Sequence, residues 1–265
     1  MELKMRPPAI LRESDALSMR LTFNRADARN SINLELLTAL NEALDEAERS
    51  ASTKVVVLRA QGDTFSSGMD FTELMSSGEP GARGMNASCA LYFRTLRRLA
   101  SFPKLVVSLV EGKVMAGGVG VVAASDLVLA SHAASFSLPE ILWGILPAMV
   151  LPFLARRVGM HHAYKLALTA QQLGAERALE LGLVDELGED SERALQRLLL
   201  RFKRIPAEGI LKLKRYANDV FPIDERVEAL AVQTTTGLAL DPAVRQRIHA
   251  FLTHQSLPWE QEGSR

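Results

Sequence analysis

The chain has 265 residues, of which 48% are hydrophobic and 23% charged, so it is long enough to bury the core of one large domain. Its 31 Lys and Arg residues balance 31 Asp and Glu residues, and this zero net charge argues against nucleic-acid and membrane partners. A single cysteine, Cys89, excludes an internal disulfide. With no apolar leader and no uninterrupted apolar span, we expect a cytoplasmic protein.

The first two thirds of the chain alternate strand and helix signals. Apolar runs predict strands at residues 17–23, 55–58, 105–110, 127–129 and 135–138. Helical spacing of apolar residues predicts helices after Asn33, which can act as N-cap, and across residues 91–99. A further helix is expected to start at Asp70, and residues 76–84, with three glycines and a proline, are expected to form a loop. The repeated strand–strand–helix order favours a layered α/β core.

From about Gly174 onward the pattern is almost purely helical. A helix over residues 175–181 is closed by Gly182, and a short extended piece follows at residues 183–185. Further helices are expected through Leu198, Leu213, Leu230 and Phe251. We therefore divide the chain into a core, residues 1–200, and a C-terminal helical oligomerisation region, residues 201–265.

Two glycine-bearing turns carry the functional signal. Ser67-Gly68-Met69-Asp70 and Ala116-Gly117-Gly118 each follow a predicted buried strand and open a helix, so they can present two backbone N–H groups to a developing oxyanion. Ala116-Gly117-Gly118 also fits close packing of a helix on a strand. Downstream, Glu140 follows Pro139 and precedes an apolar run, which predicts a raised pKa suited to proton transfer. Spacing alone equally fits a carboxylate that caps a helix N-terminus.

Six segments in order resemble the crotonase (enoyl-CoA hydratase/isomerase) superfamily: residues 21–33, 65–70, 112–118, 125–127, 139–144 and 182–185. The resemblance implies an α/β spiral of repeated ββα units, followed by C-terminal helices. It also implies a homotrimer or a dimer of trimers. It assigns the oxyanion-binding N–H groups to Met69 and Gly117 and the general acid/base to Glu140.

A narrower likeness lies in residues 68–71, 117–126 and 146–159, which resemble the dehydratases of polyketide β-branching cassettes. Those enzymes act on 3-hydroxy-3-methylglutaryl groups held on acyl carrier protein. The resemblance implies dehydration to the 3-methylglutaconyl thioester, with acyl carrier protein as partner and an acyl thioester as substrate. No bound cofactor is implied, since phosphopantetheine or CoA arrives as part of the substrate.

Two positions depart from the pattern of true hydratases. Gly120 stands where they carry a second catalytic Glu, so Glu140 alone would move the proton, and Gly120 would leave room for a β-methyl group. Phe71 stands where many CoA-using relatives carry a lysine, which fits delivery by carrier protein, although core packing explains a phenylalanine equally well.

The other expected substrate contacts follow from the resemblance or from position. They are Ser66, Ser67, Gly68, Asp70, Gly118, Gly120, Trp143 and Arg83. Arg83 and Lys113 are candidates to hold a carboxylate at the far end of the substrate, and each also fits a solvated surface charge. Trp143 joins Met75, Met85 and Met149 as a candidate lining of the acyl pocket or as ordinary core. Asp126 fits a structural hydrogen bond.

The five histidines show no metal-ligand spacing, so we expect no metal. Two other functions remain open at this point. A Δ3,Δ2-enoyl-CoA isomerase also manages with one Glu. A non-catalytic protein that binds acyl carrier protein would use one of the basic clusters, such as Arg94, Arg97 and Arg98, to dock an acidic partner.

Overall fold

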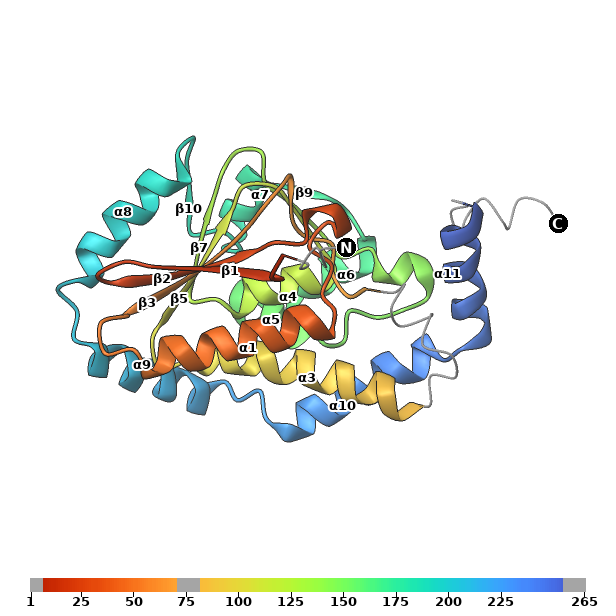
Figure 1. The fold of residues 1–265 in the computed structure, drawn as a ribbon. Helices are drawn as coiled ribbons and strands as arrows, with labels where there is room; N and C mark the ends of the chain where they lie inside the picture. Colours follow the sequence, from red (N-terminus) through yellow and green to blue (C-terminus); the bar gives the residue numbers. More distant parts are fainter. Residues whose placement is uncertain (1–6, 71–81, 255–265) are drawn as a thin grey trace, which may run out of the picture.

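The computed structural model describes residues 7–70 and 82–254, with two sheets at its centre (Figure 1). The larger sheet contains, in spatial order, β1 (Ile10–Ser14), β2 (Ser18–Phe23), β3 (Val55–Ala60), β5 (Leu105–Val110), β7 (Leu127–Ala130) and β10 (Glu186–Leu187). The smaller contains β4 (Thr64–Ser66), β6 (Lys113–Met115), β8 (Ser135–Ser137) and β9 (Leu173–Gly174). Pairing is parallel throughout, except between β1 and β2 and between β8 and β9.

A ββα unit repeats three times along the chain. The strand pairs β3–β4, β5–β6 and β7–β8 each place one strand in the larger sheet and the next in the smaller. The helices that follow are α3 (Ala82–Ser101), α4 (Gly117–Ala124), and η2 (Glu140–Trp143) with α5 (Leu151–Val158). Every residue of β5 is buried, as its unbroken apolar run predicts for a strand covered on both faces. The expected spiral of ββα units is confirmed.

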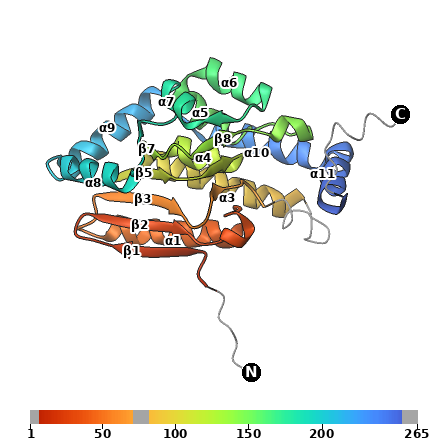
Figure 2. The same ribbon diagram turned by 90° about the horizontal axis from the view of Figure 1, so that it is seen from above.

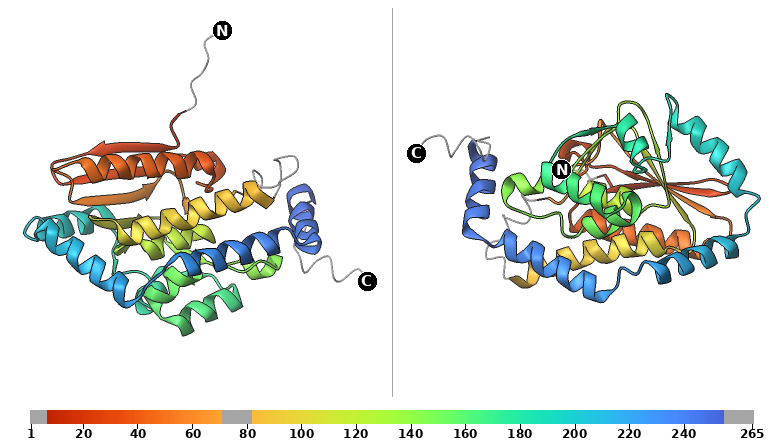
Figure 3. Two further views of the ribbon diagram at one scale, coloured as in Figure 1. Left: turned by 90° about the horizontal axis from the view of Figure 1, so that it is seen from below. Right: turned by 180° about the vertical axis from the view of Figure 1, so that it is seen from behind.

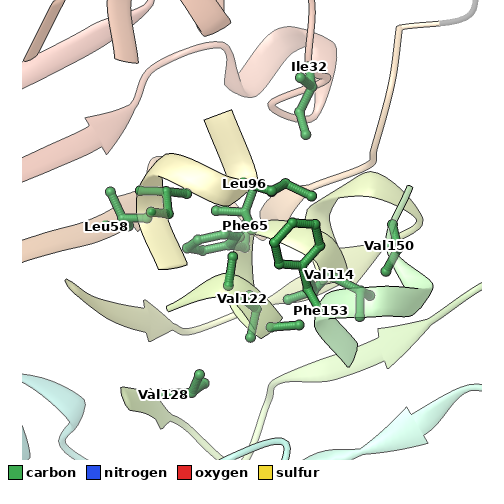
Figure 4. Packing of buried hydrophobic residues seen from close by; sticks show 14 of the residues in the cluster. Ile32, Leu58, Phe65, Leu96, Val114, Val122, Val128, Val150 and Phe153 are labelled. Carbon is green, nitrogen blue, oxygen red and sulfur yellow. The ribbon is translucent and has the colours of Figure 1, made fainter. Parts of the chain in front are cut away.

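Helices cover both faces of the larger sheet (Figure 2). On one face, α1 (Leu34–Arg49), which follows the short η1 (Ala26–Ala28), packs with α3, α4 and α5 over the main core. Figure 4 shows side chains of this core, including Phe65, Leu96, Val122 and Phe153. On the other face, α8 (Ser191–Phe202) covers Val55, Val57, Val107 and neighbouring side chains. Asn33 caps α1 as predicted, because its side chain accepts the N–H of Leu36 at 2.9 Å.

The C-terminal quarter is helical, as expected. After α6 (Met160–Thr169) and α7 (Ala175–Glu180) come α8, α9 (Ala207–Val220), α10 (Glu225–Ala239) and α11 (Pro242–His254). Figure 3 shows α10 running along α3, where Glu228 accepts hydrogen bonds from Arg94 at 2.9 Å and Arg97 at 2.8 Å. These two arginines are therefore engaged within the chain. None of the helices in the described part of the chain has the length and hydropathy needed to cross a bilayer.

Four local points differ from the sequence-based expectations or fall outside the described residues. β1 was not expected, because its exposed Arg12 and Glu13 break the apolar pattern; backbone pairing with β2 makes it an edge strand. The extended piece expected at residues 183–185 lies slightly later, as β10. α3 begins at Ala82, inside the stretch expected to be a loop, while the helix expected from Asp70 falls on residues 71–81, outside the described residues.

Candidate active site

The first glycine turn follows β4 and is held by backbone pairing to Ile32. The N–H of Ile32 donates to Gly68 O at 2.7 Å, and the N–H of Asp70 donates to Ile32 O at 3.0 Å. Between these two bonds lies Met69, whose own N–H faces away from Ile32. Gly68 has φ +92°, a conformation that side chains other than glycine rarely adopt. The turn therefore fixes the Met69 peptide from both sides.

The second turn follows β6 and packs directly against the first. A Cβ built on Gly68 would lie 2.9 Å from Gly117 N, so only glycine allows this approach. Ala116 holds φ 48° and ψ −124°, a conformation that is costly for alanine and that aims the first N–H of α4. Neither Met69 N–H nor Gly117 N–H has an acceptor among the residues that the structure describes. Two open donors thus lie on two turns in contact.

Gly118 shows that the packing interpretation of the second turn is also correct. A Cβ on Gly118 would lie 2.7 Å from Ser66 O, so this glycine lets α4 rest on β4. The two interpretations are compatible, because the close packing is what brings the turns together.

Tyr92 is a residue of the site that the sequence analysis missed. It lies on α3, is fully buried, and its hydroxyl donates to Gly117 O at 2.5 Å. Burial, and secondly the Glu140 carboxylate, raise the pKa of Tyr92 well above its ordinary value, so it stays a neutral donor. The signal in the sequence was only an apolar helix face, which predicts core and not a hydrogen bond to the second turn.

Tyr92 also corrects the expectation for Gly120. A Cβ on Gly120 would lie 2.3 Å from the Tyr92 hydroxyl and 3.0 Å from a methyl group of Leu96. The space beside Gly120 is therefore filled by the protein and is not available for a substrate methyl group. The same packing leaves no room for a glutamate side chain at this position.

Glu140 begins η2 and is 8% exposed. Its Oε2 atom is buried and has no hydrogen-bond partner among the described residues. Burial raises the pKa of this carboxyl to about 7. A buried acid with an unsatisfied oxygen is costly to keep, and a pKa near neutrality lets it both take and return a proton.

One cavity collects these groups. Its volume is about 50 Å³, and its described lining is Met69, Met85, Cys89, Tyr92, Ala116, Gly117, Glu140, Ile145, Leu146, Pro147, Ala148, Met149, Val150, Thr235 and Ala239. By the roughly 10–15 Å³ that one water needs, it has room for about three to five groups of that size. It is therefore about the size of the first few carbons of an acyl chain. The lining includes Met69 and Gly117, the two residues with open N–H groups, and Glu140, the acid with an unpartnered oxygen.

Several predicted contacts lie in the scaffold of this cavity and not on its wall. Ser66 Oγ donates to Asn30 O at 2.9 Å and accepts the N–H of Gly68, while the N–H of Ser67 donates to Arg29 O at 3.0 Å. The carboxylate of Asp70 accepts from Ser31 Oγ at 2.8 Å and from Arg25 at 3.3 Å. These bonds brace the first turn.

The structure places Trp143 outside the cavity. Its ring packs on Phe251 of α11 with centroids 4.8 Å apart, because the chain reverses at Gly144 with φ +81° and sends residues 145–150 to the cavity instead. Met85 and Met149 do line the cavity, whereas Met75 and Phe71 lie outside the described residues.

Charge is scarce at this site. No Lys, Arg or His belongs to the cavity's described lining. Lys113 lies at the surface, with Nζ 3.9 Å from a carboxylate oxygen of Asp63, and the side chain of Arg83, in the first turn of α3, is outside the described residues.

Asp126 is structural, as expected: it accepts from Val106 N and Lys214 Nζ, both at 2.7 Å. Burial raises the pKa of Cys89 to about 11, which leaves it a protonated thiol.

Comparison with known proteins finds relatives that match nearly the whole chain. The chain is 34% identical over 242 residues to the bacillaene synthase dehydratase PksH of Bacillus subtilis, covering 91% of this chain and 93% of that protein. A crystal structure of a polyketide biosynthesis enoyl-CoA hydratase (pksH) from Bacillus subtilis superposes with a TM-score of 0.86 at 31% identity, over 94% of this chain and 99% of the other.

A trans-2-decenoyl-[acyl-carrier-protein] isomerase of Streptococcus mutans is 26% identical over 236 residues, covering 87% of this chain and 90% of that protein. The sequence profile of the enoyl-CoA hydratase/isomerase family matches residues 14–261. The chain therefore belongs to the enoyl-CoA hydratase/isomerase family, the crotonases.

Proposed function

We propose that this enzyme dehydrates a 3-hydroxy-3-methylglutaryl thioester to the 3-methylglutaconyl thioester. The observation that carries the proposal is that Glu140, the one acidic residue of the described cavity lining, shares that lining with Met69 and Gly117. The backbone N–H groups of these two residues have no acceptor among the described residues. Similarity to a dehydratase of bacillaene synthase supports the polyketide setting.

The reaction follows from these groups. The thioester carbonyl oxygen accepts hydrogen bonds from the N–H groups of Met69 and Gly117, which acidifies the adjacent carbon. The ionised Glu140 takes a proton from that α-carbon, and the electron pair moves onto the carbonyl oxygen as an enolate. The protonated Glu140 then donates its proton to the β-hydroxyl, the enolate collapses, and water leaves as the α,β double bond forms.

One acid suffices because its pKa lies near 7, so neither protonation state is strongly favoured at neutral pH. A tertiary β-hydroxyl also leaves more readily than a secondary one. The absence of a second glutamate at position 120 is thus consistent with elimination, and the Tyr92 hydroxyl occupies the space that it would need.

Delivery, assembly and location belong to the same proposal. Acyl carrier protein presents the substrate through phosphopantetheine, with no other cofactor, and Arg83 holds the far carboxylate of the glutaryl group. Exposed apolar side chains on α6 and α9, among them Met160, Tyr164, Leu213 and Tyr216, support assembly into a trimer or a dimer of trimers. The enzyme acts in the cytoplasm.

Product mass tests the proposal directly. Wild type, Glu140→Gln and the exposed control Glu13→Gln are incubated with 3-hydroxy-3-methylglutaryl-pantetheine and with the same group on carrier protein, and products are analysed by mass spectrometry. We expect loss of one water with wild type and Glu13→Gln, and no reaction with Glu140→Gln. A product of unchanged mass would identify an isomerase. Carrier binding without turnover across a panel of acyl groups would identify a non-catalytic binding protein.

A further inference from the structure

Thr235 brings a second unsatisfied polar group to the cavity, from the C-terminal helices. It lies on α10 and lines the cavity together with Ala239. Its Oγ1 atom is shielded from solvent and has no hydrogen-bond partner among the described residues. A buried hydroxyl without a partner destabilises the folded protein, so its retention points to a partner that arrives with the substrate.

Thr236, the next residue in α10, shows that the helix does not force the hydroxyl of Thr235 to lack a partner. A threonine in a helix can satisfy its hydroxyl by donating to the carbonyl four residues earlier. Thr236 does so, with Oγ1 donating to Val232 O at 2.8 Å. Thr235, one position along, does not, and it is Thr235 that borders the cavity.

The character of the cavity selects the group that Thr235 would bind. The described lining has no cationic side chain, and an ionised carboxylate beside a lone hydroxyl would be poorly compensated. A neutral hydroxyl on the substrate can both donate and accept a hydrogen bond. The threonine hydroxyl can do the same, so the two groups are complementary. A cavity of about 50 Å³ holds only the first carbons of an acyl chain, so a hydroxyl that meets Thr235 there is one carried close to the thioester.

We infer that Thr235 binds the β-hydroxyl of the acyl thioester and so distinguishes hydroxylated substrates from their deoxy counterparts. This inference rests on the proposed dehydration. Hydrogen bonding by Thr235 orients the leaving hydroxyl while Glu140 transfers the proton. Because position 120 is glycine, no second glutamate is there to orient this hydroxyl.

The test separates binding from turnover. In a Glu140→Gln background, which blocks reaction, affinities are measured calorimetrically for 3-hydroxy-3-methylglutaryl-pantetheine and for 3-methylglutaryl-pantetheine, which lacks only the hydroxyl. We expect the hydroxylated ligand to bind about two- to tenfold more tightly, as one neutral hydrogen bond allows. Adding Thr235→Val should abolish that preference, while Thr235→Ser and the matched control Thr236→Val should keep it.

A preference that survives Thr235→Val, or that is missing before any change at Thr235, would overturn the inference. Circular dichroism of each variant identifies misfolding, and Thr235→Ser then tests the site with the hydroxyl retained. If the preference depends on Thr235 but the wild type loses no water from the hydroxylated thioester, the dehydration proposal fails while the binding role of Thr235 stands.

Discussion

Replacing Glu140 by glutamine should stabilise the protein at alkaline pH while removing its activity. The carboxyl has an ordinary pKa of 4.5 and a folded-state pKa of about 7, because burial penalises its charged form. The unfolded chain therefore loses this proton at lower pH than the folded protein does. The contribution of the neutral carboxyl to stability is complete below pH 4.5 and is lost as pH rises through about 7.

The magnitude follows from the shift. Each pKa unit corresponds to about 1.4 kcal/mol, so ionisation of Glu140 should lower the free energy of unfolding by about 2–3 kcal/mol between pH 5 and pH 8. Glutamine has a similar shape and does not titrate. The stability of Glu140→Gln relative to wild type should therefore rise by that amount over this range.

Urea unfolding followed by circular dichroism at pH 5, 6, 7 and 8 measures the difference. Subtracting wild type from variant cancels the titration of all other groups, and Glu13→Gln, on the exposed edge strand, is the control. If the stability difference between Glu140→Gln and wild type does not change with pH, burial does not penalise the charged form of the Glu140 carboxyl. The argument for its raised pKa would then be wrong.

Three further predictions concern the same cavity. First, kcat/KM of the wild type should rise with pH through about 7 as the buried acid becomes a base, and a flat pH profile would contradict this. Second, Gly68→Ala should lower kcat roughly 100-fold or more, because its Cβ displaces an oxyanion donor; steady-state kinetics near wild type would contradict the placement. Third, Gly120→Ala should cost about 1–3 kcal/mol of stability by urea unfolding, and less in a Tyr92→Phe background that removes the clashing oxygen; equal costs in both backgrounds would refute the clash.

Sequence reasoning reached the parts of the site that depend on local backbone. Gly68 marks a turn because glycine alone tolerates its positive φ and the close approach of Gly117 N, and Glu140 stands out as a lone acid before an apolar run. Trp143 went wrong because the reversal at Gly144 decides which side of η2 faces the cavity. The local sequence pattern does not indicate which side of η2 faces the cavity.

Tyr92 and Thr235 were missed for a different reason. Each lies on a helix whose role at the site depends on how it docks, and the docking is set by contacts between distant parts of the chain. Tyr92 reaches Gly117 across 25 positions, and Thr235 borders a cavity whose lining residues outside α10 lie 85 or more positions earlier in the sequence, Val150 being the nearest. Spacing along one helix carries no information about such contacts.

The position of Thr235 and Ala239 on the cavity wall affects how the chain can be divided. A fragment ending near residue 200 would keep both turns and Glu140 but would open the cavity to bulk water on the side where α10 stood. Water at that opening would hydrate the acid, lower its affinity for protons and compete with the acyl chain. The spiral and α10 therefore share one cavity, and under the proposed mechanism we expect an active minimal version of this enzyme to extend at least to the end of α10.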